Sequence, residues 1–156
     1  GVRVRDKLIS ALIILAPLPS LGEWAEEKII AQTILAEARG EGDFGMYAVA
    51  AVIKTRSQNR GMSFGEVCKE PFQFSCWNTG DPNRAKMDRL MSLPQARYAL
   101  FLARNMDKVT PSLIGGADHY LTTKLHRTGK IRWARGAKPV ARVNSHVFFR
   151  LNEPKP

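Results

Sequence analysis

One acidic residue lies where its side chain could transfer a proton. Glu37 comes three residues after Ile34 and seven after Ile30, so it shares the apolar face of a predicted helix. It also lies in the last turn of that helix, where the helix dipole and burial both disfavour a negative charge. We therefore expect a raised pKa for Glu37. A carboxylic acid that stays protonated near neutral pH can protonate a leaving oxygen, as cleavage of a glycosidic bond requires.

Position alone also allows a structural role for Glu37, and on that basis it is the favoured one. In that role Glu37 would form an ion pair with Arg39 or Arg56. A second acid, Glu41, follows Gly40 and is expected to be more exposed. An exposed Glu41 makes a poorer proton donor than Glu37, and it is at most an accessory polar group.

The elements that position these acids are mostly predicted helices. Apolar residues recur at helical spacing, and glycine, serine or proline marks the ends; the ranges are 25–38, 45–58, a short turn capped by Ser63, 84–92 and 94–106. An aromatic-rich loop covers 71–80. After Pro111, short β-branched and aromatic runs predict strands at 117–122 and 145–149. The expected fold class is α+β, mainly helical with a small antiparallel β region late in the chain.

Composition predicts a folded and strongly basic protein. The 156 residues suit one domain, and 44% hydrophobic with 24% charged residues argues against disorder. The formal net charge is +10. Residues 124–150 contain eight Lys or Arg and no Asp or Glu. This stretch is either a solvated basic face or a surface that binds a polyanion.

The first residues resemble a targeting segment. Three basic residues precede the apolar run 8–16, which is short for a membrane span of roughly 20 residues. We expect residues 1–23 to form a targeting or anchor segment and residues 24–156 to form the domain; a buried helix or a segment that docks on a partner are the alternatives. An exported chain could join Cys68 and Cys76 in a disulfide, whereas a cytosolic chain would keep them reduced.

Several blocks of sequence resemble one enzyme family. Residues 34–42 and 48–56 resemble the E-A-R-G-E turn and the A-V-A-x-V-I-x-N-R helix of the SleB-type, spore-cortex-lytic cell wall hydrolases. Residues 72–77 match the family's Q-F-S-x-W loop, and residues 116–120 match its G-A-x-H-Y strand. Trp133 and residues 146–149 match its late W and H-x-F-Y pattern. The blocks follow in the family's order, with departures at Thr55, Leu121 and Phe149.

The resemblance implies a lysozyme-like fold and a single catalytic acid. Glu37 would act as the general acid of a lytic transglycosylase, cleaving peptidoglycan glycan strands between N-acetylmuramic acid and N-acetylglucosamine without a metal or other cofactor. The family motifs also place accessory or substrate-binding residues at Glu41, Gln73, Ser75, Trp77, His119, Tyr120, Trp133 and His146.

The expected partners and location follow from the same resemblance. Besides the glycan strand, the basic stretch would contact an anionic membrane or outer-membrane surface, with no nucleic acid partner. The protein would be a monomer unless it is part of a virion. It would be exported to the periplasm or cell wall, or carried in a phage particle as an endolysin or virion-associated lysin.

Two other functions stay open at this stage. A zinc-dependent N-acetylmuramoyl-L-alanine amidase would recruit His119, His126 or His146 together with Glu37, although no H-E-x-x-H spacing supports it. A non-catalytic basic module that binds wall polymer or nucleic acid would need only the charge.

Overall fold

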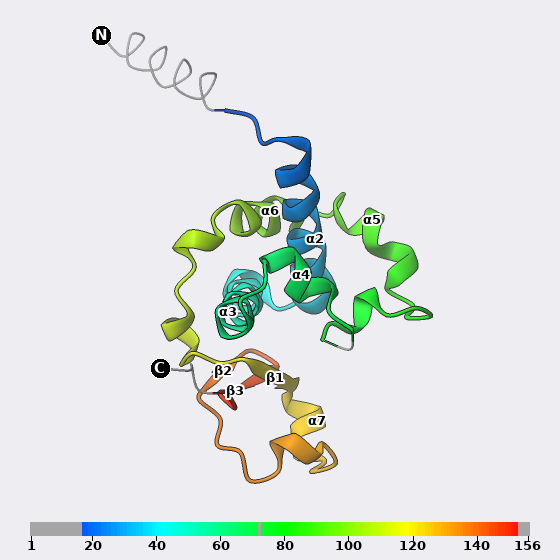
Figure 1. Cartoon of the computed structure of the whole chain (residues 1–156). Coiled ribbons are helices and arrows are strands. Elements are labelled where there is room, and N and C mark those ends of the chain that lie inside the picture. The colour runs from blue at the N-terminus through cyan, green and yellow to red at the C-terminus, as the bar shows by residue number, and fades with distance from the viewer. Residues whose placement is uncertain (1–16, 72, 153–156) are drawn as a thin grey trace, which may run out of the picture.

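The computed structural model describes residues 17–71 and 73–152, and Figure 1 shows helices grouped around α2 and α3 with a small sheet below them. Most of the predicted targeting segment therefore lies outside the described residues, and its boundary at residue 24 stays a prediction. None of the helices in the described ranges is both long and apolar enough to cross a bilayer.

Two long helices form the centre of the molecule. Helix α2 spans Leu21–Ala38 and begins at Ser20, whose Oγ accepts a hydrogen bond from the backbone N–H of Glu23 at 3.1 Å. It starts four residues earlier than predicted because this cap lies outside the apolar stripe. Helix α3 spans Gly42–Arg60 and ends at Gly61, whose φ of 65° suits glycine. The middle of α3 is buried on every side, as a central core helix requires.

Shorter elements cover these two helices. Helix α4 (Phe64–Lys69) begins with the expected Ser63 cap, here a full capping box with Glu66. The helix predicted at 84–92 is wrong in extent: it divides into a 3₁₀ turn, η2 (Arg84–Lys86), and one α turn, α5 (Met87–Leu90), because only Met87 and Leu90 are buried. The remaining elements before the sheet are η1 (Ser75–Trp77), α6 (Ala96–Arg104), η3 (Met106–Lys108) and η4 (Pro111–Ile114).

The late part of the chain forms a three-stranded antiparallel sheet with the order β1-β3-β2. The strands are β1 (His119–Thr122), β2 (Ala141–Val143) and β3 (His146–Phe149); helix α7 (Thr123–Arg127) and η5 (Arg132–Ala134) lie between β1 and β2. The short strand β2 was not predicted, because three residues carry too little alternation. Phe148 packs in the main core, whereas Val147 and Phe149 pack with Ala134 in a second cluster, so the sheet has two covered faces.

Cys68 and Cys76, whose oxidation state the sequence left open, do not form a disulfide. Cys68 and Cys76 are both free, buried thiols, and burial raises the pKa of each to about 12. Both belong to the main hydrophobic core. They therefore contribute as small apolar side chains rather than as nucleophiles.

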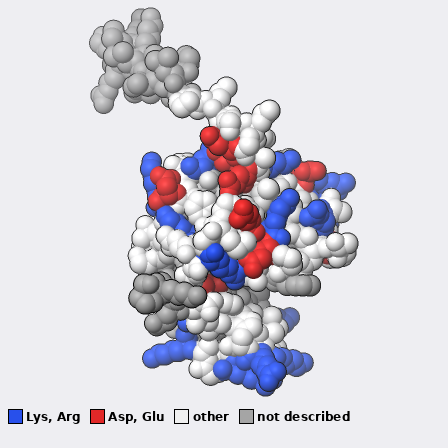
Figure 2. All heavy atoms as spheres, viewed as in Figure 1, with Lys and Arg blue, Asp and Glu red and all other residues white. Residues whose placement is uncertain are grey.

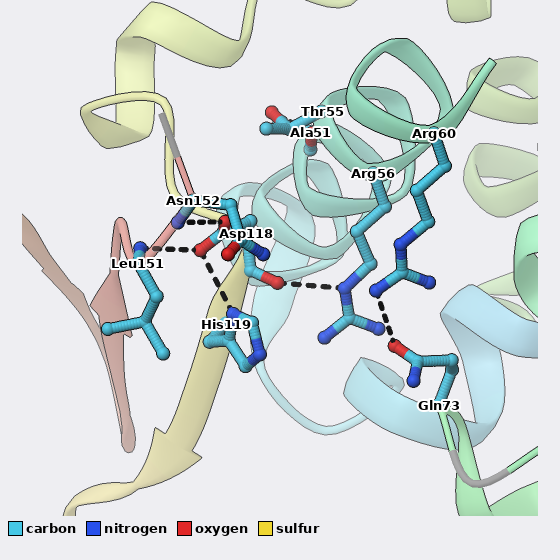
Figure 3. A network of polar contacts seen from close by, with 9 residues as sticks. All are labelled: Ala51, Thr55, Arg56, Arg60, Gln73, Asp118, His119, Leu151 and Asn152. Carbon is cyan, nitrogen blue, oxygen red and sulfur yellow. Dashed lines mark hydrogen bonds and ion pairs between the residues drawn. The ribbon is translucent and has the colours of Figure 1, made fainter. Parts of the chain in front are cut away.

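The buried carboxylate of Asp118, the residue before β1, bonds the backbone that follows β3. Asp118 is 1% exposed, and its carboxylate accepts hydrogen bonds from the backbone N–H groups of Leu151 and Asn152 at 2.8 Å each and contacts His119 Nδ1 at 2.9 Å (Figure 3). Burial by itself would raise the pKa of Asp118, but these three donors together lower it. The ionised form is therefore the one that the fold stabilises.

We expect Asp118→Asn to lower the free energy of unfolding by about 2 kcal/mol at pH 7, because charge-assisted hydrogen bonds are lost and an amide N–H₂ faces backbone donors. Since the folded pKa lies below that of an unfolded Asp, this contribution is present above about pH 4 and disappears as the pH falls through the folded value. Urea unfolding at pH 7 and pH 3 measures both. Asp107→Asn, at an exposed position, is the control, and equal stability of the two variants at pH 7 would contradict the assignment.

Candidate active site

The side chain of Glu37 meets the sheet at a single strong hydrogen bond. Glu37 occupies the last turn of α2, is partly buried, and its Oε2 accepts the hydroxyl proton of Tyr120 at 2.7 Å. Tyr120 lies in β1 and packs its ring against Phe148 of β3. The acid is thus held between the end of a core helix and a strand 83 residues further along the chain.

Helix α3 adds a buried cation to this site. Arg56 is 6% exposed, its Nε donates to the backbone carbonyl of Asp118 at 2.7 Å, and its guanidinium carbon lies 4.9 Å from the centre of the Phe74 ring. Figure 3 shows the side chain reaching from α3 toward β1. Asp118 and Tyr120 are two residues apart in the chain, so Arg56 and Glu37 contact nearly the same point of the sheet.

Burial dominates the protonation of Glu37. It raises the pKa of Glu37 above its ordinary value, while the Tyr120 hydroxyl and then the Arg56 cation lower it, and Asp81 adds a smaller rise. Burial, followed by the Glu37 carboxyl, raises the pKa of Tyr120 well above its ordinary value, so the phenol stays a donor. The raised pKa expected from helix position is therefore confirmed in direction. Neither predicted ion-pair partner forms a direct bond: Arg39 bonds the carbonyls of Leu35 and Ala36, and Arg56 bonds Asp118.

Glu41 connects the beginning of α3 to the turn between β2 and β3. Its side chain is only 16% exposed, and it contacts His146 Nδ1 at 3.2 Å and accepts hydrogen bonds from Ser145. Glu41 is partly buried, as Glu37 is, because the turn between β2 and β3 contacts it. His146 in turn lies edge-on to the Tyr120 ring at 5.2 Å. Glu41 therefore contacts His146, which in turn packs against the ring of Tyr120.

Three predicted residues lie on the segment before α5. Gln73 accepts a hydrogen bond from Arg60 at 3.0 Å, and Ser75 is exposed at the start of η1. Trp77 donates from Nε1 to Thr33 of α2 at 2.8 Å. Lys69 and Arg84 lie 5.1 and 5.2 Å from its ring centre, so cations already contact the indole that was expected to meet sugar.

His119 and Trp133 form a separate pair. Their rings are 4.9 Å apart, and Trp133 also contacts Phe149 on the face of the sheet that is covered by η5. Adjacent residues of a strand point to opposite faces, so His119 points away from the Tyr120 side. The structure therefore assigns the orientation of Glu37 to Tyr120, and not to His119.

The sequence interpretation missed the role of several polar residues. Arg56 was named only as an ion-pair partner of a structural Glu37, although it follows Ile53 by three and Val49 by seven residues, the same spacing that singled out Glu37. Asp118, Arg60 and Thr33 had no such signal, because each has a partner that is distant in sequence. Asp118 bonds Leu151 and Asn152, which are 33 and 34 residues away, Arg60 bonds Gln73 at 13 residues, and Thr33 bonds Trp77 at 44 residues. In residues 17–71 and 73–152 no group of three or more His, Cys, Asp or Glu could hold a metal ion, so the amidase interpretation gains no ligand set there.

Comparison with known proteins is consistent with this architecture. The sequence model of a family described as Cell Wall Hydrolase matches residues 40–149, a range that begins just after Glu37. No curated protein matches the chain.

Two solved structures have a similar fold. One is the catalytic domain of the Bacillus cereus SleB protein, with a TM-score of 0.59, 23% identity, and coverage of 86% of this chain and 94% of that chain. The other is the catalytic domain of the germination-specific lytic transglycosylase SleB from Bacillus anthracis, with a TM-score of 0.61, 22% identity, and coverage of 86% and 100%. These similarities confirm the predicted fold class.

We expect Tyr120→Phe to raise the pKa of Glu37 further, because the hydrogen bond that favours the carboxylate is removed while burial remains. A ¹³C NMR titration of the glutamate carboxyl groups measures this directly. Tyr98→Phe is the matched control, since that ring stacks on Phe101 away from the site. An unchanged Glu37 titration in Tyr120→Phe would show that the hydrogen bond has no electrostatic effect.

Proposed function

The chain belongs to the cell wall hydrolase family, and from this premise we propose that it cleaves the glycan strands of peptidoglycan as a lytic transglycosylase with Glu37 as general acid. The observation that carries the proposal is the state of Glu37: a partly buried carboxyl with a raised pKa, aligned by the 2.7 Å bond from Tyr120. The fold shared with the two SleB catalytic domains supports it.

The chemistry needs one group that first gives and then takes a proton. Glu37 would protonate the oxygen that joins N-acetylmuramic acid to N-acetylglucosamine, and the C1–O bond would break with its electron pair going to that oxygen. The C6 hydroxyl of the muramic acid would then form a bond to C1 and return its proton to the Glu37 carboxylate. The products are a 1,6-anhydro sugar and a free N-acetylglucosamine hydroxyl, with Glu37 restored.

This route requires no second carboxylate as nucleophile. Glu41, the nearest acid in sequence, is engaged by Ser145 and His146. Asp81 influences Glu37 only through its charge, and its Oδ1 accepts the backbone N–H of Asn83 at 2.8 Å. Intramolecular attack by the sugar suits a site in which the acids near Glu37 are already engaged in other contacts.

We expect Glu37→Gln to reduce peptidoglycan lysis by about 100-fold or more, because the amide cannot supply the proton. Glu23→Gln, the same change at the exposed beginning of the same helix, should leave lysis unchanged. Mass spectrometry of the wild-type products should detect anhydro-muramic ends. Reducing ends would indicate a hydrolase and free peptides an amidase, whereas binding of peptidoglycan without cleavage would favour a non-catalytic module.

The cations of the basic stretch, residues 124–150, are not among the groups that change the pKa of Glu37. We define the basic face as the eight cations of this stretch, all exposed: Lys124, Arg127, Lys130, Arg132, Arg135, Lys138, Arg142 and Arg150. No carboxylate in the described ranges forms an ion pair with them. Figure 2 shows blue atoms without red ones at the end of the molecule that carries α7. We propose that this face binds an anionic layer of the cell envelope and holds the enzyme beside its substrate.

We expect the double variant Arg127→Gln with Lys138→Gln to bind intact cell walls less tightly at low salt, with little difference from wild type at 1 M salt, where charges more than about 3 Å apart are screened. Co-sedimentation with cell walls over a salt series measures this. Lys86→Gln with Arg89→Gln removes the same charge from exposed positions elsewhere and serves as control. Equal loss of binding in both variants would show that net charge, and not the basic face, is responsible.

A further inference from the structure

Among the residues that the structure describes, the buried guanidinium of Arg56 has no partner for one of its nitrogens. Its Nε bonds Asp118 and its carbon faces Phe74, but no hydrogen-bond acceptor in that part of the chain meets the buried Nη1. An arginine stays protonated in proteins, and a buried cation without an anion is costly. The fold therefore retains a positive charge in the core that its resting contacts satisfy only in part.

The acids near Arg56 are few, and most are already engaged. The Asp118 carboxylate accepts hydrogen bonds from Leu151 and Asn152 and contacts His119, so it acts on Arg56 through its charge, while its backbone oxygen accepts the hydrogen bond from Arg56 Nε. The groups whose charge acts on Arg56 are Tyr120, Arg60, Asp118 and Glu37. Tyr120 stays a neutral phenol, and Arg60 is a cation that bonds Glu70 at 2.5 Å. Asp118 is ionised in the folded protein, whereas burial favours the protonated form of Glu37, so Glu37 is the acid in this set whose charge can change during a reaction.

We propose that Arg56 is a positioning residue for Glu37: its guanidinium stabilises the carboxylate that forms when Glu37 has given its proton to the glycosidic oxygen, and so prepares it to accept the proton of the C6 hydroxyl. This inference rests on the proposed function. Burial favours the protonated form of Glu37, which donates the proton to the glycosidic oxygen. The Arg56 cation favours the carboxylate form, which accepts the proton of the C6 hydroxyl.

The geometry suits this role because the cation is fixed before the reaction. Asp118 and Phe74 hold the guanidinium, and β1 carries both Asp118 and the Tyr120 that bonds Glu37. Three charged or titratable groups from three different segments act on Glu37: Tyr120 from β1, Arg56 from α3 and Asp81 from the segment between η1 and η2. A preorganised charge stabilises a developing anion without reorganisation at the moment of reaction.

The test compares Arg56→Met, Arg56→Gln and Arg56→Lys in the whole protein by two measurements. A ¹³C NMR titration should show the pKa of Glu37 rising by about one unit in Arg56→Met and Arg56→Gln, as expected when an opposite charge is lost, and by clearly less in Arg56→Lys. The activity requires protonated Glu37, so it falls as pH rises through that pKa. The alkaline limb of the kcat profile should therefore move upward by the same amount, while the maximal kcat falls about tenfold or more.

Arg60→Met is the control for the shift in the alkaline limb of the kcat–pH profile. It removes a cation one helical turn further along α3 that pairs with Glu70, and the limb should not move whatever its effect on rate. If Arg56→Met does not fold, Arg56→Gln carries the comparison.

An unmoved Glu37 titration in the neutral variants, with activity reduced equally at every pH, would overturn the inference and leave Arg56 a packing residue. The NMR arm does not depend on the reaction. If Glu37→Gln keeps lytic activity, the proposed function fails while the Arg56–Glu37 coupling is still measured.

Discussion

The site depends on the desolvation of one carboxyl at the point where α2 ends. Helix α2 must pack its apolar stripe against α3, α4 and α6, and Glu37 continues that stripe by one more turn. The residue is thereby withdrawn from water whether or not an anion is stable there. Burial is consequently the largest influence on the pKa of Glu37, and the contacts with Tyr120 and Arg56 act against it by favouring the carboxylate.

Strand β1 positions the groups that offset the desolvation of the Glu37 carboxylate. It brings the Tyr120 hydroxyl to Glu37, and the residue before the strand, Asp118, presents its carbonyl to Arg56. The Asp118 carboxylate then ties the same place to the chain after β3, as Figure 3 shows. Misplacing β1 would disturb the acid, the phenol and the cation together. The small sheet therefore positions the polar groups of the candidate site, which the helices alone would leave without these partners.

Charge is divided unequally over the molecule. The acids on and near α2 and α4 form local ion pairs, such as Glu27 with Arg104 and Glu70 with Arg60. The basic face has no such partners in the described ranges, so its cations are left exposed to solvent there. A wall-cleaving enzyme acts on an insoluble polymer, and a surface that holds it near that polymer raises the effective concentration of substrate.

The sequence by itself determined the helical framework and the acid, because both follow from local periodicity: Ile30, Ile34 and Glu37 share one face by spacing alone. It also contained an equivalent signal for Arg56 after Val49 and Ile53. Only the tertiary structure decided which partners these residues meet. Tyr120 rather than His119 reaches Glu37, Glu41 is tied to the β2–β3 turn, and Cys68 and Cys76 stay reduced in the core. Those contacts join positions far apart in the chain, and their geometry is set by how the sheet packs on α3, which no local pattern encodes.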